Sequence, residues 1–121
     1  MEYPENEKEI SNFVKKFYKS EIPVEIIGNS SKRKIGKPLQ CAKTLNLSKL
    51  SGIVEYLPEE LYIKVKAGTP IKLIEAELKK NKQQLAFEPI DFGYLFTGKS
   101  DYGTAAGQVA CNISGPRRFK V

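Results

Sequence analysis

The spacing of hydrophobic residues in the first thirty positions predicts one helix followed by one strand. Asn6 and Glu9 have the spacing of a capping box, in which two side chains satisfy backbone donors at a helix start. A helix is therefore predicted from about Glu7 to Lys19, where apolar residues recur on one helical face: Ile10, Phe13, Val14 and Phe17. The β-branched run Val24–Ile27 then predicts a short strand that leads directly into Gly28.

Alternation of apolar and polar residues predicts further strands in the middle of the chain. One strand is expected from Thr44 to Leu47. Residues 53–56 and 61–66 are expected to form a hairpin across the turn at residues 58–60. In the second of these segments apolar residues occupy every other position, as a strand with one exposed face requires.

A second helix is predicted after the hairpin. Thr69 is expected to cap its start, and Pro70 to occupy its first turn, where a missing N–H has no cost. The helix should bury a stripe formed by Ile71, Ile74 and Leu78, and should stop at Asn81.

The last part of the chain differs in character from the rest. Residues 91–116 contain five glycines among small residues and show no helical period, which predicts loops and short turns. Asp91 and Asp101 fall in this segment and are interpreted as solvated turn residues, so no catalytic residue is assigned.

Composition limits the class of protein. A chain of 121 residues with 40% hydrophobic and 28% charged residues is expected to form one small soluble domain of α/β (α+β) type. It contains no histidine, the commonest general base and a frequent metal ligand, and no metal site is expected. The N-terminus is polar and no apolar run could span a bilayer, so a cytoplasmic location is predicted.

The net charge of +6 favours anionic partners without choosing among nucleotides, nucleic acids and membrane surfaces. Part of this charge is concentrated near Gly36, and part at the C-terminus: Lys32, Arg33, Lys34 and Lys37, then Arg117, Arg118 and Lys120. The two cysteines, Cys41 and Cys111, have no metal-site spacing and are expected to be reduced.

The loop that follows the first strand is a candidate phosphate site. A strand followed by Gly28-Asn29-Ser30-Ser31-Lys32 can direct several backbone N–H groups and two hydroxyls towards one anion. The loop matches neither the P-loop nor the Gly-x-Gly-x-x-Gly dinucleotide pattern. The residues alone are equally compatible with an ordinary polar loop.

Several consecutive motifs together resemble the vanillyl-alcohol oxidase type, also called the PCMH type, of FAD-binding domain. Within this family the chain is similar to the FAD-binding subunits of bacterial glycolate oxidases. The motifs lie between Val24 and Arg118 and occur in the family's order: Ile26-Ile27-Gly28-Asn29-Ser30-Ser31-Lys32 up to Gly36, Leu47-Ser48-Lys49-Leu50-Ser51-Gly52-Ile53-Val54-Glu55-Tyr56, Val65-Lys66-Ala67-Gly68-Thr69-Pro70, Gln84-Leu85-Ala86-Phe87-Glu88-Pro89, and the segment from Gly103 to Arg118.

The resemblance implies a fold, a cofactor and a set of binding residues. Residues 1–121 would form a partial FAD-binding domain, with a small α/β subdomain over about residues 1–90 and the glycine-rich start of a second subdomain over about 91–121. The implied cofactor is FAD, with the loop amides on its diphosphate and the second segment along its other side. The implied cofactor-binding residues are Gly28, Asn29, Ser30, Ser31, Lys32, Gly36, Thr104, Gly107, Ala110 and Asn112.

The resemblance also implies an activity and partners. The chain would be the FAD-binding portion of a flavin-dependent 2-hydroxy-acid (glycolate-type) oxidoreductase, truncated before the substrate site and inactive alone. Its partners would be FAD and either other subunits of a glycolate oxidase-like complex or a chain carrying the missing half. Two alternatives remain open at this point: a non-catalytic interaction subunit, and a small basic nucleic-acid-binding module, which lacks a recognisable sequence signature here.

Overall fold

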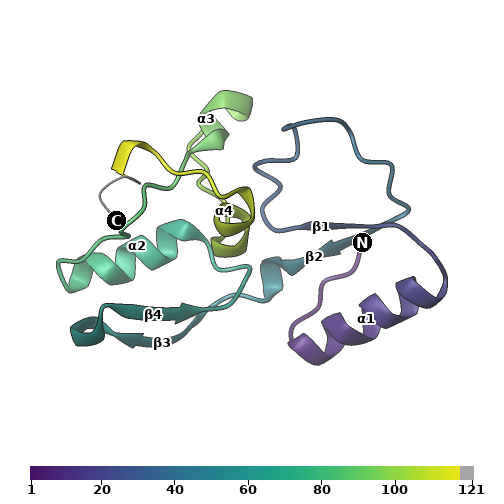
Figure 1. The fold of residues 1–121 in the computed structure, drawn as a ribbon, viewed down its shortest axis with the longest axis horizontal. Coiled ribbons are helices and arrows are strands. Elements are labelled where there is room, and N and C mark those ends of the chain that lie inside the picture. Colours follow the sequence, from purple (N-terminus) through teal and green to yellow (C-terminus); the bar gives the residue numbers. More distant parts are fainter. Residues whose placement is uncertain (118–121) are drawn as a thin grey trace.

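The computed structural model describes residues 1–117 and contains helices and strands in two groups (Figure 1). The first group consists of α1 (Glu7–Lys19), β1 (Val24–Ile27) and β2 (Lys43–Asn46). The second consists of β3 (Ile53–Leu57), β4 (Tyr62–Val65), α2 (Ile71–Lys80), α3 (Phe92–Thr97) and α4 (Ala105–Cys111). Arg118 and Lys120, which belong to the basic C-terminal cluster, lie outside the described residues.

The first group contains a two-stranded parallel sheet. β1 pairs with β2 in the register Val24 to Lys43 and Ile27 to Asn46, and Glu2 adds a bridge to Leu45. Helix α1 has the predicted bounds, because the Asn6 side chain accepts a hydrogen bond from the Glu9 N–H, as a capping box requires. Strand β2 lies one residue earlier than predicted, since Leu47 already begins a 3-10 turn.

The second group is built on an antiparallel hairpin. β3 and β4 pair across a 3-10 turn at Pro58–Glu60, with a register shift between Ile53 and Glu55. Helix α2 packs on the hairpin and buries the predicted stripe of Ile71, Ile74 and Leu78. Apolar residues from the hairpin, from the segment after α2 and from the C-terminal segment pack against this stripe: Tyr56, Ile63, Val65, Leu85, Tyr102 and Ala105.

The predicted cap of α2 is wrong. The helix begins at Ile71, with Pro70 at the N-cap position and no capping side chain. The Thr69 side chain is fully buried, and its hydroxyl donates to the Lys66 carbonyl (2.7 Å) and accepts from the Gly52 N–H (3.0 Å). The Thr69 hydroxyl, which the local sequence pattern predicted as the cap of α2, is therefore bonded to Lys66 and Gly52 instead.

The prediction that residues 91–116 form only loops and turns is also wrong, because α3 and α4 lie there. Each helix is short, contains glycine and begins at a polar cap. The Asp91 carboxylate accepts from the Gly93 N–H (2.9 Å), and the Thr104 hydroxyl accepts from the Gly107 N–H (3.3 Å). Helices of this length are held by caps and packing and leave little periodicity to detect.

The C-terminal segment is joined to the start of α2 by main-chain hydrogen bonds. The Ile71 N–H donates to the Gly103 carbonyl (3.0 Å), and the Ala105 N–H donates to the Thr69 carbonyl (2.8 Å). The buried Gln108 amide donates to the carbonyls of Ile90 and Tyr102 at 2.9 and 2.6 Å. These bonds place α4 opposite the loop that follows β1 (Figure 1).

Candidate functional site

A cleft of about 640 Å³ lies between the loop after β1 and helix α4. Residues 25–39 form one wall, and Thr104, Gly107, Ala110 and Cys111 form the other. Its size is that of a small-molecule or cofactor site. The cleft joins the two groups of secondary structure, so neither group could form it alone.

The two walls touch at positions that only small residues can occupy. A Cβ atom on Gly28 would lie 2.7 Å from the Thr104 hydroxyl oxygen. Gly103 has φ of +72°, and a Cβ atom there would lie 2.7 Å from the Ser31 hydroxyl oxygen. Glycine is needed at both places because backbone and neighbouring side chain approach closely.

The loop leaves a series of backbone donors free. Within residues 1–117, the N–H groups of residues 29–32 donate no hydrogen bond. The next turns are closed by the Arg33 N–H on the Ser30 carbonyl (3.1 Å) and the Ile35 N–H on the Lys32 carbonyl (3.0 Å). Ser30 has φ of +59°, which bends the chain sharply just after the strand. Consecutive free amides in such a turn can surround an anion.

Lys32 extends from the loop to the opposite wall. Its ammonium nitrogen lies 5.7 Å from the centre of the Phe92 ring, within the range of a cation–π interaction. The same nitrogen would lie 3.1 Å from a Cβ atom on Gly103 and 3.8 Å from one on Gly107. A positive charge therefore stands beside the glycines of the second wall, where an anionic ligand would be held.

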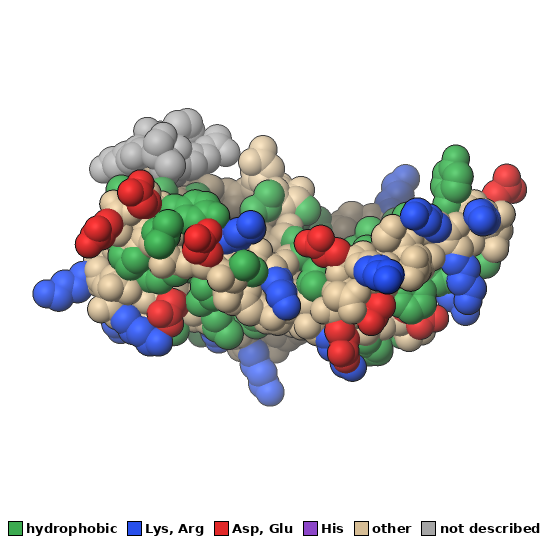
Figure 2. Space-filling view, turned by 90° about the horizontal axis from the view of Figure 1, so that it is seen from below, with side chains coloured by type: hydrophobic (Ala, Val, Ile, Leu, Met, Phe, Trp, Pro, Cys, Tyr) green, Lys and Arg blue, Asp and Glu red, His purple; other side chains and the backbone are tan. Residues whose placement is uncertain are grey.

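The charge on the cleft contrasts with that of another face of the molecule. Figure 2 shows basic and acidic side chains interspersed over the face seen from below. At the cleft, Lys34 and Lys37 join Lys32 among the lining residues. The loop therefore concentrates part of the net positive charge where the free amides lie.

The structure brings together the predicted cofactor-binding residues with one exception. Those that line the cleft are Gly28, Asn29, Ser30, Ser31, Lys32, Gly36, Thr104, Gly107 and Ala110. Asn112 ends α4 in a left-handed conformation, with φ of 47°, and does not belong to the lining. The contact of each residue with FAD stays a prediction.

Three polar features of the structure were not predicted, and two of them lie in the cleft. Glu25 is buried on β1 and lines the cleft; its signal in the sequence is a carboxylate within a β-branched strand. Asp91 is not a solvated turn residue, because its Oδ1 accepts N–H bonds from Gly93 and Asp101 and its Oδ2 is buried. Cys111 lines the cleft, and it and Cys41 are both free, partly buried thiols.

No group of three or more metal-ligating side chains occurs within residues 1–117. Over the same range, no helix combines the length and the apolar character needed to cross a membrane. The donors present, which are backbone amides, hydroxyls and ammonium groups, suit phosphate oxygens. The diphosphate of a dinucleotide fits this set of donors.

An α/β fold with an amide-lined, electropositive cleft is typical of a nucleotide-cofactor domain. A family model described as an FAD binding domain matches residues 2–121, and the chain belongs to this family. The predicted family and the predicted cofactor, FAD, are thereby confirmed.

A curated relative covers most of this chain. The chain is 40% identical over 96 residues to the glycolate oxidase subunit GlcE of Escherichia coli (strain K12). The match covers 79% of this chain and 25% of GlcE, so the aligned part spans about a quarter of that relative's length.

Solved structures share the fold. Alkyldihydroxyacetonephosphate synthase crystallised in P212121 matches with a TM-score of 0.71 and 17% identity, covering 93% of this chain and 20% of that one. The same enzyme crystallised in P1 matches with a TM-score of 0.65 and 15% identity, covering 93% and 22%. The predicted fold class, a mixed α/β portion of a PCMH-type FAD-binding fold, is confirmed.

Proposed function

We propose that residues 28–32 hold the diphosphate of FAD and that the chain is the FAD-binding part of a flavin-dependent 2-hydroxy-acid (glycolate-type) oxidoreductase. The observation that carries the first part is the set of free N–H groups at residues 29–32, in a loop that lines the cleft opposite a wall of small residues. The similarity to GlcE, named as a glycolate oxidase subunit, supports the second part.

The residues of this chain would bind and orient the cofactor. The loop amides and the Ser30 and Ser31 hydroxyls would donate to the phosphate oxygens, while the Lys32 ammonium would balance their charge. Gly107, which lines the cleft, would allow the cofactor to approach the second wall closely. When bound, FAD supplies the hydride acceptor for oxidation of the 2-hydroxy acid. No residue of this chain is assigned to proton transfer.

We also propose that the domain acts in an assembly. GlcE is named as a subunit, so further subunits of a glycolate oxidase-like complex are the proposed partners. The division into subdomains near residue 90 and the cytoplasmic location stay predictions.

Replacement of both loop serines by tryptophan tests the phosphate assignment. Ser31 lies against Gly103, so a large side chain there should separate the walls and weaken FAD binding by about 100-fold or more, the loss expected when several charge-assisted hydrogen bonds disappear. FAD fluorescence titration of the full-length protein measures the affinity, and far-UV circular dichroism checks the fold. ADP, which carries the same diphosphate, should compete with FAD.

The matched control is Ser11→Trp, because Ser11 is exposed on α1 and does not line the cleft. It should bind FAD as the wild type does. Equal FAD affinity in the wild type and in the Ser30→Trp/Ser31→Trp variant would remove the loop from the binding site.

A further inference from the structure

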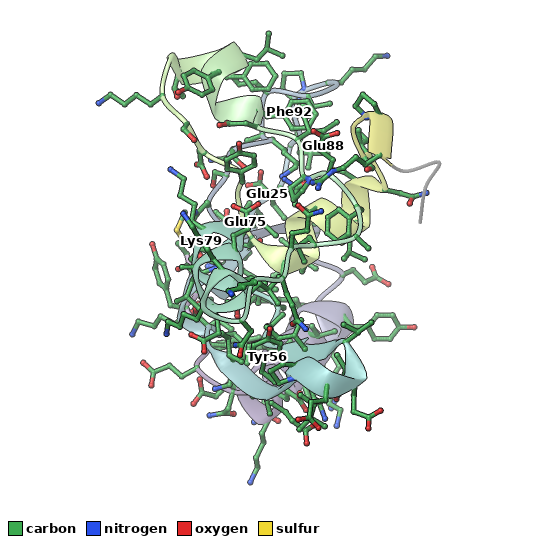
Figure 3. All side chains as sticks on the ribbon, turned by 90° about the vertical axis from the view of Figure 1, so that its left-hand side faces the viewer. Glu25, Tyr56, Glu75, Lys79, Glu88 and Phe92 are labelled. Atoms are coloured by element: carbon green, nitrogen blue, oxygen red, sulfur yellow. The ribbon has the colours of Figure 1, made fainter. Side chains whose placement is uncertain are left out.

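Glu25 is an acidic residue in an unusual place. It lies in the middle of β1 with an exposed fraction of 7%, although carboxylates are rarely buried unless they are paired. Figure 3 is seen from the side of the hairpin and α2, and Glu25 belongs to β1 of the other group, behind them in this view. Glu25 also lines the cleft, three residues before Gly28. A charge in this position needs a specific partner.

That partner comes from the loop itself. Arg33 Nη2 donates to Glu25 Oε2 at 2.7 Å, and the Thr44 hydroxyl of β2 donates to the same oxygen at 3.4 Å. The Arg33 side chain is half exposed, so the pair lies at the border between interior and solvent. Removal of one member of a buried pair is costly because the other charge is left uncompensated.

Arg33 is held at two points. Its side chain is tied to β1 through Glu25, and its N–H closes the turn on the Ser30 carbonyl. Ser30 adopts a positive φ, a conformation that residues other than glycine seldom adopt unless the surroundings enforce it. The ion pair therefore lies where it can hold the turn that leaves the N–H groups of residues 29–32 free.

The Glu25–Arg33 pair gives the two adjacent cations of the loop, Lys32 and Arg33, different surroundings. The charge of Arg33 is compensated by Glu25, whereas Lys32 extends over the Phe92 ring towards the second wall. Without Glu25 the Arg33 side chain would lose this contact, and only its N–H bond to the Ser30 carbonyl would remain. The carboxylate thus compensates one of the four cations that line the cleft.

We propose that Glu25 is a positioning residue for the anion-binding loop. Acting through Arg33, it holds residues 28–33 in the conformation that directs the amides into the cleft. This role requires no contact between Glu25 and the cofactor or the substrate. This inference rests on the proposed function, since the ligand that the loop would hold is the FAD diphosphate.

The central experiment is Glu25→Gln in the full-length protein, with Glu5→Gln as the matched control. Glu5 also pairs with a cation, Lys49 at 2.8 Å, but both side chains are exposed and remote from the cleft lining. Glu25→Gln should weaken FAD and ADP binding by about tenfold or more, as loss of a buried charged partner does. Glu5→Gln should leave both affinities unchanged. Fluorescence titration and competition measure them.

A double-mutant cycle shows whether Glu25 acts through Arg33. Glu25→Gln, Arg33→Gln and the double variant should lose similar FAD affinity, because each breaks the same link. Losses that add in the double variant would overturn the proposed route. If Glu25→Gln does not fold, Arg33→Gln alone breaks the contact between Nη2 and Oε2, and unchanged FAD affinity in that variant would contradict the proposal.

A cofactor-independent measurement separates this inference from the proposed function. The loop offers trypsin the sites Lys32, Arg33 and Lys34, and its cleavage should be faster in Glu25→Gln than in the wild type or Glu5→Gln. If the wild type binds no FAD but Glu25→Gln is still cleaved faster than the wild type, the proposed function is overturned, and the anchoring of the loop by Glu25 is supported. Normal FAD affinity and normal cleavage in Glu25→Gln would overturn the positioning role alone.

Discussion

Gly28 is the residue at which the strand, the loop and the second wall meet. Its missing side chain leaves room for Thr104, whose hydroxyl also caps α4. The contact makes the cleft dependent on two residues far apart in the sequence. Any side chain at position 28 must displace Thr104 or move β1 away from α4.

Gly28→Ala should therefore lower the free energy of unfolding by about 1–3 kcal/mol, the usual cost of overpacking a close contact. The methyl group would stand 2.7 Å from the Thr104 oxygen and 2.8 Å from its methyl carbon. Urea denaturation followed by circular dichroism measures the change. Asn29→Ala, at the adjacent exposed position, should change the free energy little; an equal loss in both variants would argue against the contact as the cause.

Among the elements, α3 and α4 show how short helices form in a glycine-rich segment. Each begins at a side-chain cap, and α4 is additionally held by the buried Gln108 amide. Asp91 caps α3 and also accepts the Asp101 N–H at 2.8 Å, so it joins the two ends of the loop around α3. Because protonation of the Asp91 carboxylate would weaken these hydrogen bonds, the stability of this segment should depend on pH.

Burial raises the pKa of Asp91, but hydrogen bonds from the Asp101 N–H, the Ser100 hydroxyl and the Gly93 N–H outweigh it and hold the pKa below the ordinary aspartate value. The folded state thus binds its proton less readily than the unfolded state. The resulting stabilisation is present above the unfolded pKa, near about 4, and is lost as pH falls through the lower folded value.

Asp91→Asn should remove this dependence. Between neutral pH and about pH 3, the melting temperature of the wild type should fall more steeply than that of the variant, because only the wild type must protonate Asp91. Thermal melts at a series of pH values give the comparison. Parallel curves for the two proteins would mean that Asp91 contributes nothing to the acid sensitivity.

At the scale of the whole molecule, the cleft belongs to both groups of secondary structure. The loop after β1 comes from the group with α1, and α4 comes from the group with the hairpin (Figure 1). The groups also meet where the Gly68 N–H donates to the Leu50 carbonyl at 2.8 Å. A ligand in the cleft would contact both groups and couple their stabilities.

FAD at about 100 times its dissociation constant should stabilise the folded state by about 2.7 kcal/mol. Because a ligand in the proposed position would bridge the groups, amide hydrogen exchange should slow in β1 and α4 together. Exchange measured by mass spectrometry with and without FAD checks this expectation. Protection confined to one group would show that FAD does not span the cleft.

The local pattern alone determined the elements whose structure depends on near neighbours. Helix α1 has its predicted bounds because the capping pair and the apolar stripe lie within one segment. Strand β1 was predicted from its own β-branched run, which is also local. The family and FAD could be predicted because several motifs occur together in order, although each is weak alone. These features need no knowledge of what packs against them.

Only the tertiary structure decided how polar groups are used. Thr69 has the pattern of a helix cap but is taken up by Gly52 and Lys66, and Asp91 is held by the main chain of a loop that closes on it. The contact of Gly28 with Thr104 and the pairing of Glu25 with Arg33 likewise depend on chain segments brought together by folding. A hydrogen-bonding side chain has several possible partners, and packing selects among them.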